Sequence, residues 1–427
     1  MRKIIFAAFF FAVSTFSIAQ TVVRIPIGKS SESADAPVKL TLIARIQNYN
    51  EHAASDSDFL NKHIDSPKSV NILDSRNKFY IHSLEGCETL VFSLDSLKML
   101  KVIPHTFSQK DTALFHENTV LGYSFSYHGV VNSFSGKPVE SCFTHNKKYL
   151  WVTYYRRSFD LNAMQPSAVA IIDTECDSIV RVMPTGPLPK MVAVSPDGKY
   201  LAVTHWGDNT IGIIDVSSSN PNDFHYVHHF VVDYRLSLKG DGNKPINRDS
   251  ECGFCLRGTV FSPDGKYLLV GRMGGGGIAF FDMDKMIYMG TLWGMKTNVR
   301  HLTIAGNDLL VSCTRPGFVQ KAPIDSLIAC MERKQKNYGS WENAFVGIGV
   351  RTIDVSPDRK YIFSAINNGS KIAITDFTTM EIISTVSADS FPVGLAVTED
   401  GTKLIVTSQG RNGIGGGNSV MIFSVEY

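Results

Sequence analysis

The chain has 427 residues, with 42 lysine and arginine residues against 40 aspartate and glutamate residues. This near balance argues against a general polyanion binder such as a nucleic-acid protein, which normally shows a strong basic excess. The length exceeds what one ordinary core organises, so it indicates either several domains or a repeat architecture. Seven cysteines in so long a chain do not form a disulfide scaffold.

The first segment, Met1 to Gln20, has the pattern of a secretory signal peptide. Arg2 and Lys3 precede an apolar run at residues 4–13, and small residues at 17 and 19 predict cleavage after Ala19. No later stretch approaches the roughly 20 apolar residues that a membrane-spanning helix needs. We therefore predict a secreted or periplasmic protein, and this prediction also covers a protein associated with the cell surface. The predicted mature chain is formally neutral.

From residue 68 onward the sequence repeats a unit of four short apolar runs. The copies begin at Lys68, Val139, Lys190, Arg257, Arg300, Arg351 and Val393. In each copy two runs are joined by a tight turn, a third ends near an Asp, and a fourth follows. Four strands per unit, at a spacing of roughly 40 to 50 residues, are typical of a propeller blade. The sequence therefore predicts an all-β protein, a seven-bladed β-propeller of four-stranded antiparallel blades, as a single domain over residues 20–427.

The ends of the repeat array predict how the ring of blades closes. The last copy runs out of chain after its third strand, Ser419 to Tyr427. A strand-like segment at residues 38–46 lies upstream of the first blade and has no blade of its own. Because an unpaired sheet edge is a liability, we expect this segment to complete the last blade as its outer strand.

The turns carry a resemblance to a known family. Ser195 to Tyr200 spells Ser-Pro-Asp-Gly-Lys-Tyr, residues 262–267 repeat it, and the third strands end in Asp, as in Ile-Ile-Asp at Asp215. These features resemble the YVTN-type (surface-layer, YncE-like) propeller repeats over nearly the whole mature chain. The third strong copy has Arg359 where Gly is expected. The resemblance implies a fold, whereas related propellers include lactonases and cofactor-bearing dehydrogenase subunits, so it does not assign an activity.

The repeat places one position at the entrance of every innermost strand, and these seven positions should form a ring around the channel mouth. Five of the seven are basic: Lys68, Lys190, Arg257, Arg300 and Arg351. Either these side chains are solvated or paired with acids such as Glu140, or they bind an anion. Crowded cations repel one another, and Arg suits bidentate recognition of carboxylate or phosphate, so the second interpretation predicts an anionic ligand.

The loops that join second and third strands should open onto the same face. Their candidate ligand-binding residues are Arg156, Arg157, His205, Trp206, Arg272, Arg315 and Arg411, and beside them lie Tyr154, Tyr155, Asn367, Asn368 and Gln409. Aromatic surface beside guanidinium groups suits a small anion with a planar or apolar body, or a charged sugar. The aromatic residues could equally pack the loops against one another. Three long insertions, at 107–137, 234–251 and 322–349, could partly cover the mouth.

Two further patterns are weak candidates for chemistry. Cys252 and Cys255 form a Cys-x-x-Cys pair that could be a redox motif, half a zinc site or a small disulfide; no second pair completes a zinc set, which favours a local disulfide or two inert thiols. The histidines at 225, 228 and 229 lie on a predicted strand whose alternation splits them between two faces. We predict neither a metal nor a cofactor.

These observations favour a monomeric, non-catalytic binding module that recognises a small anion, or a protein or glycan partner, at the basic mouth of the channel. The first alternative is a lactonase-like hydrolase that polarises a carbonyl with the same cations. The second is a purely structural envelope protein. No catalytic residue can be named from the sequence.

Overall fold

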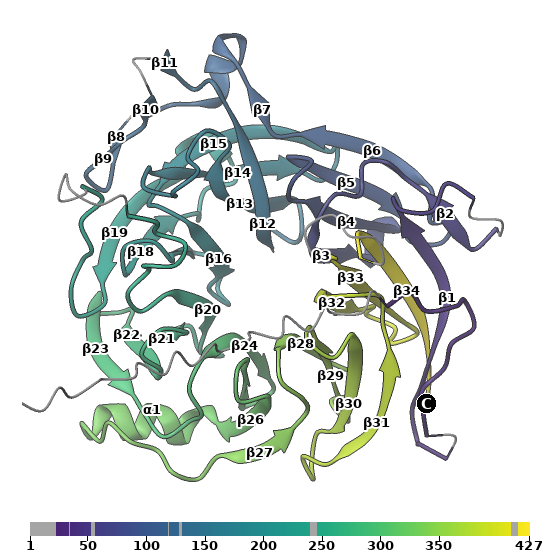
Figure 1. Cartoon of the computed structure of the whole chain (residues 1–427). Coiled ribbons are helices and arrows are strands. Elements are labelled where there is room, and N and C mark those ends of the chain that lie inside the picture. Colours follow the sequence, from purple (N-terminus) through teal and green to yellow (C-terminus); the bar gives the residue numbers. More distant parts are fainter. Residues whose placement is uncertain are drawn as a thin grey trace, which may run out of the picture.

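A computed structural model describes residues 23–33, 35–52, 56–117, 119–127, 130–239, 246–410 and 417–427. The predicted signal peptide at 1–19 lies outside these residues. Within them, seven sheets of four or five strands stand around a central channel, so the predicted seven-bladed β-propeller is confirmed (Figure 1). The part of the chain that the structure describes contains no helix long and apolar enough to cross a membrane.

In six blades the four strands follow one another outward from the channel as an antiparallel meander, whereas the last blade takes its outer strand from the N-terminal part of the chain. The inner strands are β3 (Pro67–Leu73), β12 (Phe134–Thr144), β16 (Pro189–Val194), β20 (Leu256–Phe261), β24 (Val299–Ala305), β28 (Val350–Val355) and β32 (Pro392–Val397). The second strands are β4 (Lys78–Ser83), β13 (Tyr149–Arg157), β17 (Tyr200–His205), β21 (Tyr267–Arg272), β25 (Asp308–Cys313), β29 (Tyr361–Ile366) and β33 (Lys403–Ser408).

The outer half of each blade completes the four-stranded unit. The third strands are β5 (Glu88–Ser93), β14 (Ser167–Asp173), β18 (Thr210–Asp215), β22 (Ile278–Asp282), β26 (Phe318–Pro323), β30 (Lys371–Asp376) and β34 (Ser419–Glu426). The outer strands are β6 (Met99–Pro104), β15 (Ser178–Thr185), β19 (His225–Val231), β23 (Ile287–Leu292), β27 (Glu342–Phe345), β31 (Ile382–Ser387) and β1 (Lys39–Gln47). Buried apolar side chains from facing sheets fill the space between neighbouring blades.

The repeated turn forms because its side chains replace missing backbone partners. In the copy at 195–200 the Ser195 hydroxyl bonds the Asp197 carboxylate at 2.5 Å and accepts the Tyr200 N–H at 2.9 Å. Gly198 has φ of 72°, the left-handed conformation that favours glycine. Arg359 adopts φ of 58° at the equivalent position, so its turn keeps the same shape at a conformational cost.

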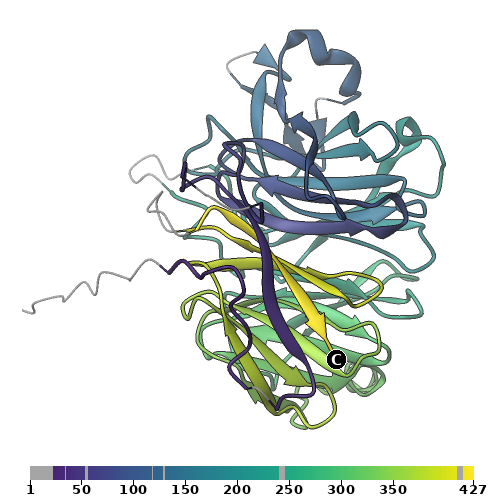
Figure 2. The ribbon, with the colours of Figure 1, turned by 90° about the vertical axis from the view of Figure 1, so that its right-hand side faces the viewer.

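The N-terminal strand lies beside the C-terminal one. β1 pairs antiparallel with β34 from Lys39 opposite Glu426 to Gln47 opposite Ser419, and it thereby forms the outer strand of the last blade (Figure 2). Leu40 and Leu42 are fully buried in a cluster with Phe423. A short strand, β2 (Asp58–Leu60), adds parallel to β1, and Arg45 bonds Asp58 and, at 3.2 Å, Asp389.

Two of the three long insertions lie at the rim of the ring and not over the channel (Figure 1). The first contains the short strands β7 (Thr106–Phe107), β8 (Thr119–Val120), β9 (Tyr123–Ser124), β10 (Ser126–Tyr127) and β11 (Val130–Val131) with the 3-10 helix η2 (Gln109–Leu114). The insertion at 322–349 forms the helix α1 (Ile324–Glu332) and then the strand β27. The sequence pattern did not predict this helix. The insertion at 234–251 reaches the channel region through Asp249, which lines the cavity described below.

The pairing of β1 with β34 predicts unequal effects for two adjacent residues. Leu42→Ala should lower the free energy of unfolding by about 2 to 5 kcal/mol, because it leaves a cavity in the cluster that joins the two chain ends. Ile43→Ala is the matched control, since Ile43 is 40% exposed and should cost less than about 1 kcal/mol. Denaturant unfolding measures both, and equal losses would contradict a buried closing strand.

Candidate anion-binding site

Every inner strand has an irregularity at its ring position. The pairing register with the second strand shifts across Lys68, Val139, Lys190, Arg257, Arg300, Arg351 and Val393 in the seven blades. A bulge bends its strand and re-aims the side chain that it carries. The backbone therefore turns the same repeat position toward the channel in each blade.

The five ring cations meet at one cavity of about 290 Å³. Its wall consists of Lys68, Leu84, Glu85, Val139, Tyr155, Arg156, Lys190, Trp206, Asp249, Arg257, Arg300 and Arg351. This volume is just below the roughly 300 to 1,000 Å³ that small-molecule sites occupy. The wall has six cations against two carboxylates, Glu85 and Asp249, and a third carboxylate, Glu140, is bonded to Arg257. The cavity is therefore positive although the whole chain is nearly neutral.

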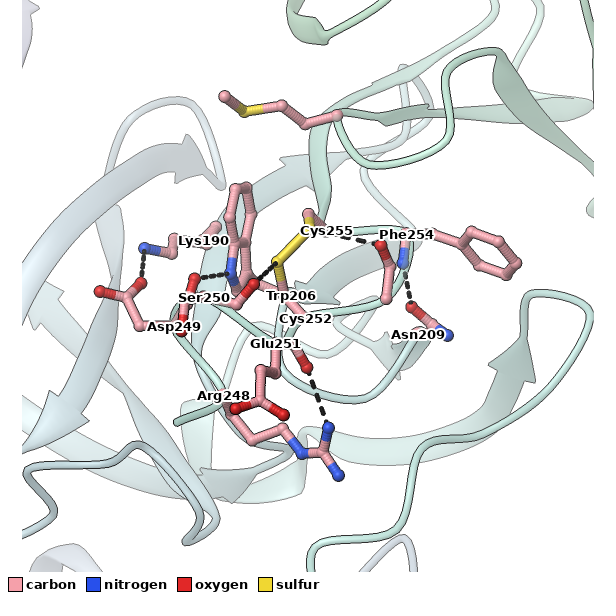
Figure 3. The surroundings of a disulfide bond; sticks show 12 residues. Lys190, Trp206, Asn209, Arg248, Asp249, Ser250, Glu251, Cys252, Phe254 and Cys255 are labelled. Carbon is pink, nitrogen blue, oxygen red and sulfur yellow. Dashed lines mark hydrogen bonds and ion pairs between the residues drawn. A yellow bond between two sulfur atoms is a disulfide. The ribbon is translucent and has the colours of Figure 1, made fainter. Parts of the chain in front are cut away.

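Two of the ring cations are paired with acids, as one of the two interpretations of the ring predicted. Arg257 bonds the Glu140 carboxylate at 2.8 Å, and Lys190 lies 3.5 Å from the Asp249 carboxylate. Lys190 is also 3.7 Å from the centre of the Tyr155 ring and 4.9 Å from that of Trp206, close enough for cation–π contacts. Figure 3 shows Lys190 and Asp249 facing each other beside Trp206.

The other three ring cations have no carboxylate partner among the described residues. The Lys68 ammonium donates to the Gln409 side chain at 2.8 Å, and one Arg300 nitrogen is 3.7 Å from the Met273 sulfur. The buried Nε of Arg351 has no hydrogen-bond partner. These residues come from the first, fifth and sixth blades, and only the blade with Val393 stands between Arg351 and Lys68. These three cations, the Lys68–Arg300–Arg351 triad, therefore have no carboxylate in contact among the described residues, although the charge of Glu140 acts on Arg300 and Arg351 from further away.

Burial and mutual repulsion disfavour the charged forms in this cavity. Burial, then the charges of Arg351 and Lys190, lower the pKa of Lys68 well below its ordinary value. Burial also lowers the pKa of Lys190 to about 7 and that of Arg351 to about 10. The pKa of Arg300 falls for the same reason, with Arg257 and Arg351 as the nearest repelling charges. An anion in the cavity would relieve this repulsion.

The remaining predicted residues divide between the cavity and other places. Arg156 and Trp206 line it, and Arg156 also donates to the Leu161 carbonyl at 2.7 Å. Arg315 does not line it but lies in an adjacent cavity. Arg411 lies outside the described residues.

Arg157, His205 and Arg272 differ from the prediction because they are the last residues of β13, β17 and β21 and not loop residues. His205 is fully buried between the Thr185 and Thr210 hydroxyls, at 2.7 and 2.8 Å. Arg157 is buried with its guanidinium 4.5 Å from the centre of the Phe125 ring. Arg272 bonds Thr291 and Asp233, and its guanidinium is 3.7 Å from the Phe254 ring centre. All three stabilise packing away from the cavity wall.

The adjacent cavity has a volume of about 560 Å³. Its wall consists of Trp206, Asp249, Ser250, Cys252, Cys255, Met273, Gly274, Gly275, Gly276, Thr297, Asn298 and Arg315, so it shares Trp206 and Asp249 with the basic cavity. Cys252 and Cys255 form a local disulfide in this wall, as one of the sequence alternatives held (Figure 3). Asp249 comes from the 234–251 insertion, and no motif in the sequence singled it out.

The described residues contain no group of three or more His, Cys, Asp or Glu side chains that could hold a metal ion. The histidines at 225, 228 and 229 lie on the outer strand β19, remote in the blade from the inner strands that form the cavity.

No protein-family model matches the chain, and no curated protein matches its sequence. Solved structures match its fold. A chain of hydrazine synthase from Kuenenia stuttgartiensis is similar over 88% of this chain and 98% of its own length, with a TM-score of 0.59 and 12% identity. A chain of a mitotic checkpoint complex is similar over 90% of this chain and 93% of its own, with a TM-score of 0.56 and 12% identity.

The β-propeller domain of Cps50 (Swd1) from Myceliophteria thermophila is similar over 85% of this chain and 97% of its own length, with a TM-score of 0.56 and 10% identity. Identities this low carry the fold alone. The chain is thus a seven-bladed β-propeller, a class of fold that often serves as a binding module or scaffold, and its function has to be argued from the cavity.

The crowded charge in the cavity predicts that removing one cation stabilises the fold. Lys68→Met should raise the free energy of unfolding by about 1 kcal/mol at pH 7, because an apolar side chain of similar length ends the repulsion without leaving an acid unpaired. Lys62→Met is the control, since the Lys62 side chain is 79% exposed and should change stability by less than about 0.5 kcal/mol. A clear loss of stability in Lys68→Met, measured by denaturant unfolding, would contradict the repulsion.

Proposed function

We propose that this protein is an exported binding module that holds a small anion in the basic cavity of its channel, against the Lys68–Arg300–Arg351 triad. The observation that carries the proposal is that these three half-buried cations have no carboxylate partner among the described residues. Two other ring cations in the same wall do have one. Three ring cations therefore lack a carboxylate in contact within the described part of the chain, and an external anion can supply that negative charge.

The chemistry of the triad fits a carboxylate, sulfate or phosphate group. Guanidinium groups bind such oxyanions through two parallel hydrogen bonds, and an ammonium adds a compact charge. Inside a narrow cavity these contacts are screened less by water and salt than on an open surface. The ligand is small, because the cavity has about 290 Å³ and two of its wall residues, Tyr155 and Trp206, are bulky aromatics.

Binding accounts for the site better than the lactonase-like alternative does. The carboxylates at the ring are engaged with cations, Glu140 with Arg257 and Asp249 with Lys190. Against the effect of burial, the Lys190 ammonium and the Tyr155 hydroxyl hold the pKa of Asp249 below its ordinary value, which makes it a weak base. Burial raises the pKa of Glu140, but its carboxylate is bonded to the Arg257 guanidinium.

The proposed context of this binding module rests on the sequence. The Ser-Pro-Asp turns, whose hydroxyl–carboxylate bonds recur at Ser262 and Ser356, support a relationship to the YVTN-type propellers. The pattern at residues 1–19 supports export, and we propose a single domain over 20–427 that acts as a monomer in the periplasm or outside the cell. A protein or glycan that presents an anionic group is a partner of the same chemistry.

Sulfate is a suitable first probe because its charge does not change near neutral pH. Isothermal titration should detect sulfate binding to the unmodified protein, and Arg300→Ala and Arg351→Ala should each weaken it by about tenfold or more, since each removes a charged hydrogen-bond donor. Arg333→Ala is the matched control, because Arg333 lies at the exposed end of α1.

The proposal fails if sulfate does not bind, or if the Arg333 variant loses as much affinity as the two cavity variants. Melting temperatures of all four proteins show that any loss of binding occurs in a folded chain.

A further inference from the structure

The two cavities at the channel mouth are not independent, because Trp206 and Asp249 belong to the walls of both. We propose that they form one composite site for an acidic sugar, with its anionic group on the Lys68–Arg300–Arg351 triad and its hydroxyl groups donating to Asp249. This inference rests on the proposed function, and it names the chemical class of the ligand. Asp249 becomes the residue that determines specificity.

Asp249 is held firmly at the boundary between the cavities. The Trp206 indole donates to the Asp249 backbone carbonyl at 3.1 Å (Figure 3). On the same segment Arg248 donates to the Glu251 carbonyl at 2.9 Å, and three residues beyond Asp249 the chain is closed by the Cys252–Cys255 disulfide. The Asp249 side chain nevertheless remains 41% exposed, and the residue lines both cavities. A fixed and accessible acceptor is what recognition of a hydroxyl group requires.

Asp249 is ionised at neutral pH. Although burial opposes its charge, the Lys190 ammonium and the Tyr155 hydroxyl hold the pKa of its carboxyl below the ordinary value. An ionised carboxylate accepts hydrogen bonds and donates none. It therefore attracts hydroxyl or amine donors and repels any second anionic group of a ligand. The site as a whole selects a molecule with one anionic end and donors at the other.

The wall beyond Asp249 suits a hydroxylated ring. Trp206 provides an aromatic surface that both cavities share, and Ser250, Thr297 and Asn298 add short polar side chains. The three glycines at 274–276 leave the wall without bulky side chains there. A pocket with an aromatic surface and a few fixed polar groups binds the apolar face of a ring while it orients the hydroxyl groups.

Other ligand types fit the composite site less well. A neutral sugar would leave the triad without a counter-charge, and an acid with an apolar body would take water from Asp249 without offering a hydrogen bond in return. A dianion with widely spaced charges would bring its second charge against Asp249. Each mismatch leaves a polar or charged group of the site unsatisfied.

Three probes of similar size separate these possibilities. D-Glucuronate has a carboxylate and hydroxyl groups, cyclohexanecarboxylate has a carboxylate and a ring without hydroxyl groups, and D-glucose has hydroxyl groups without the charge. In calorimetric titrations of the full chain, we expect glucuronate to bind at least tenfold more tightly than either of the others.

Variants of Asp249 and Arg351 test separately the half of the site that binds hydroxyl groups and the half that binds the anionic group. Asp249→Ala should reduce the preference for glucuronate over cyclohexanecarboxylate by about tenfold, whereas Arg351→Ala should weaken both acids by the same factor. Asp249→Asn retains the shape and some capacity to accept hydrogen bonds. Its preference for glucuronate should therefore fall between those of the unmodified protein and the Asp249→Ala variant. The asparagine variant also provides a test if the alanine variant does not fold.

The outcomes distinguish this inference from the proposed function. If glucuronate and cyclohexanecarboxylate bind equally, or if Asp249→Ala strengthens both acids equally, Asp249 is only a competing charge and the inference is wrong while anion binding stands. The same holds if sulfate binds and glucuronate does not. If neither sulfate nor any acid binds, the proposed function itself has failed.

Discussion

Like charges that share a confined cavity repel one another, and the ring position of this propeller creates that situation. Seven blades repeat one backbone bulge, and the bulge turns one side chain per blade toward the channel. When five of these side chains are basic, symmetry brings their charges together in about 290 Å³. The fold tolerates this repulsion because the strand ladders and the buried apolar clusters between the blades hold the ring together, and local strain of this kind is characteristic of binding sites.

The chain relieves the repulsion on one side only. Glu140 comes from the inner strand of the second blade, whereas Asp249 comes from the insertion at 234–251, so the two acids that pair with ring cations break the symmetry of the ring. What remains is a triad of cations opposite a fixed carboxylate. The cavity therefore has a cationic side and an anionic side. This arrangement suits a ligand with one acidic end better than it suits anions in general.

The sequence predicts the regular features and misses the irregular ones. The repeated turn marks the strands well enough to align Lys68, Lys190, Arg257, Arg300 and Arg351, because the geometry of a propeller converts equal repeat positions into one ring. It places Arg157, His205 and Arg272 in loops, but their strands continue to these residues and turn them into the packing between blades. Asp249 could not be found in this way, since its position depends on the path of a unique insertion and on tertiary contacts with Trp206 and Lys190.

The most direct test of the central claim, that the triad is an open anion site, is to locate a heavy anion in the protein. Crystals soaked in bromide should show an ordered anomalous-scattering peak in the basic cavity, within contact distance of Lys68, Arg300 and Arg351. Bromide distributed over surface lysines, with no peak in a cavity that is open to solvent, would contradict the account.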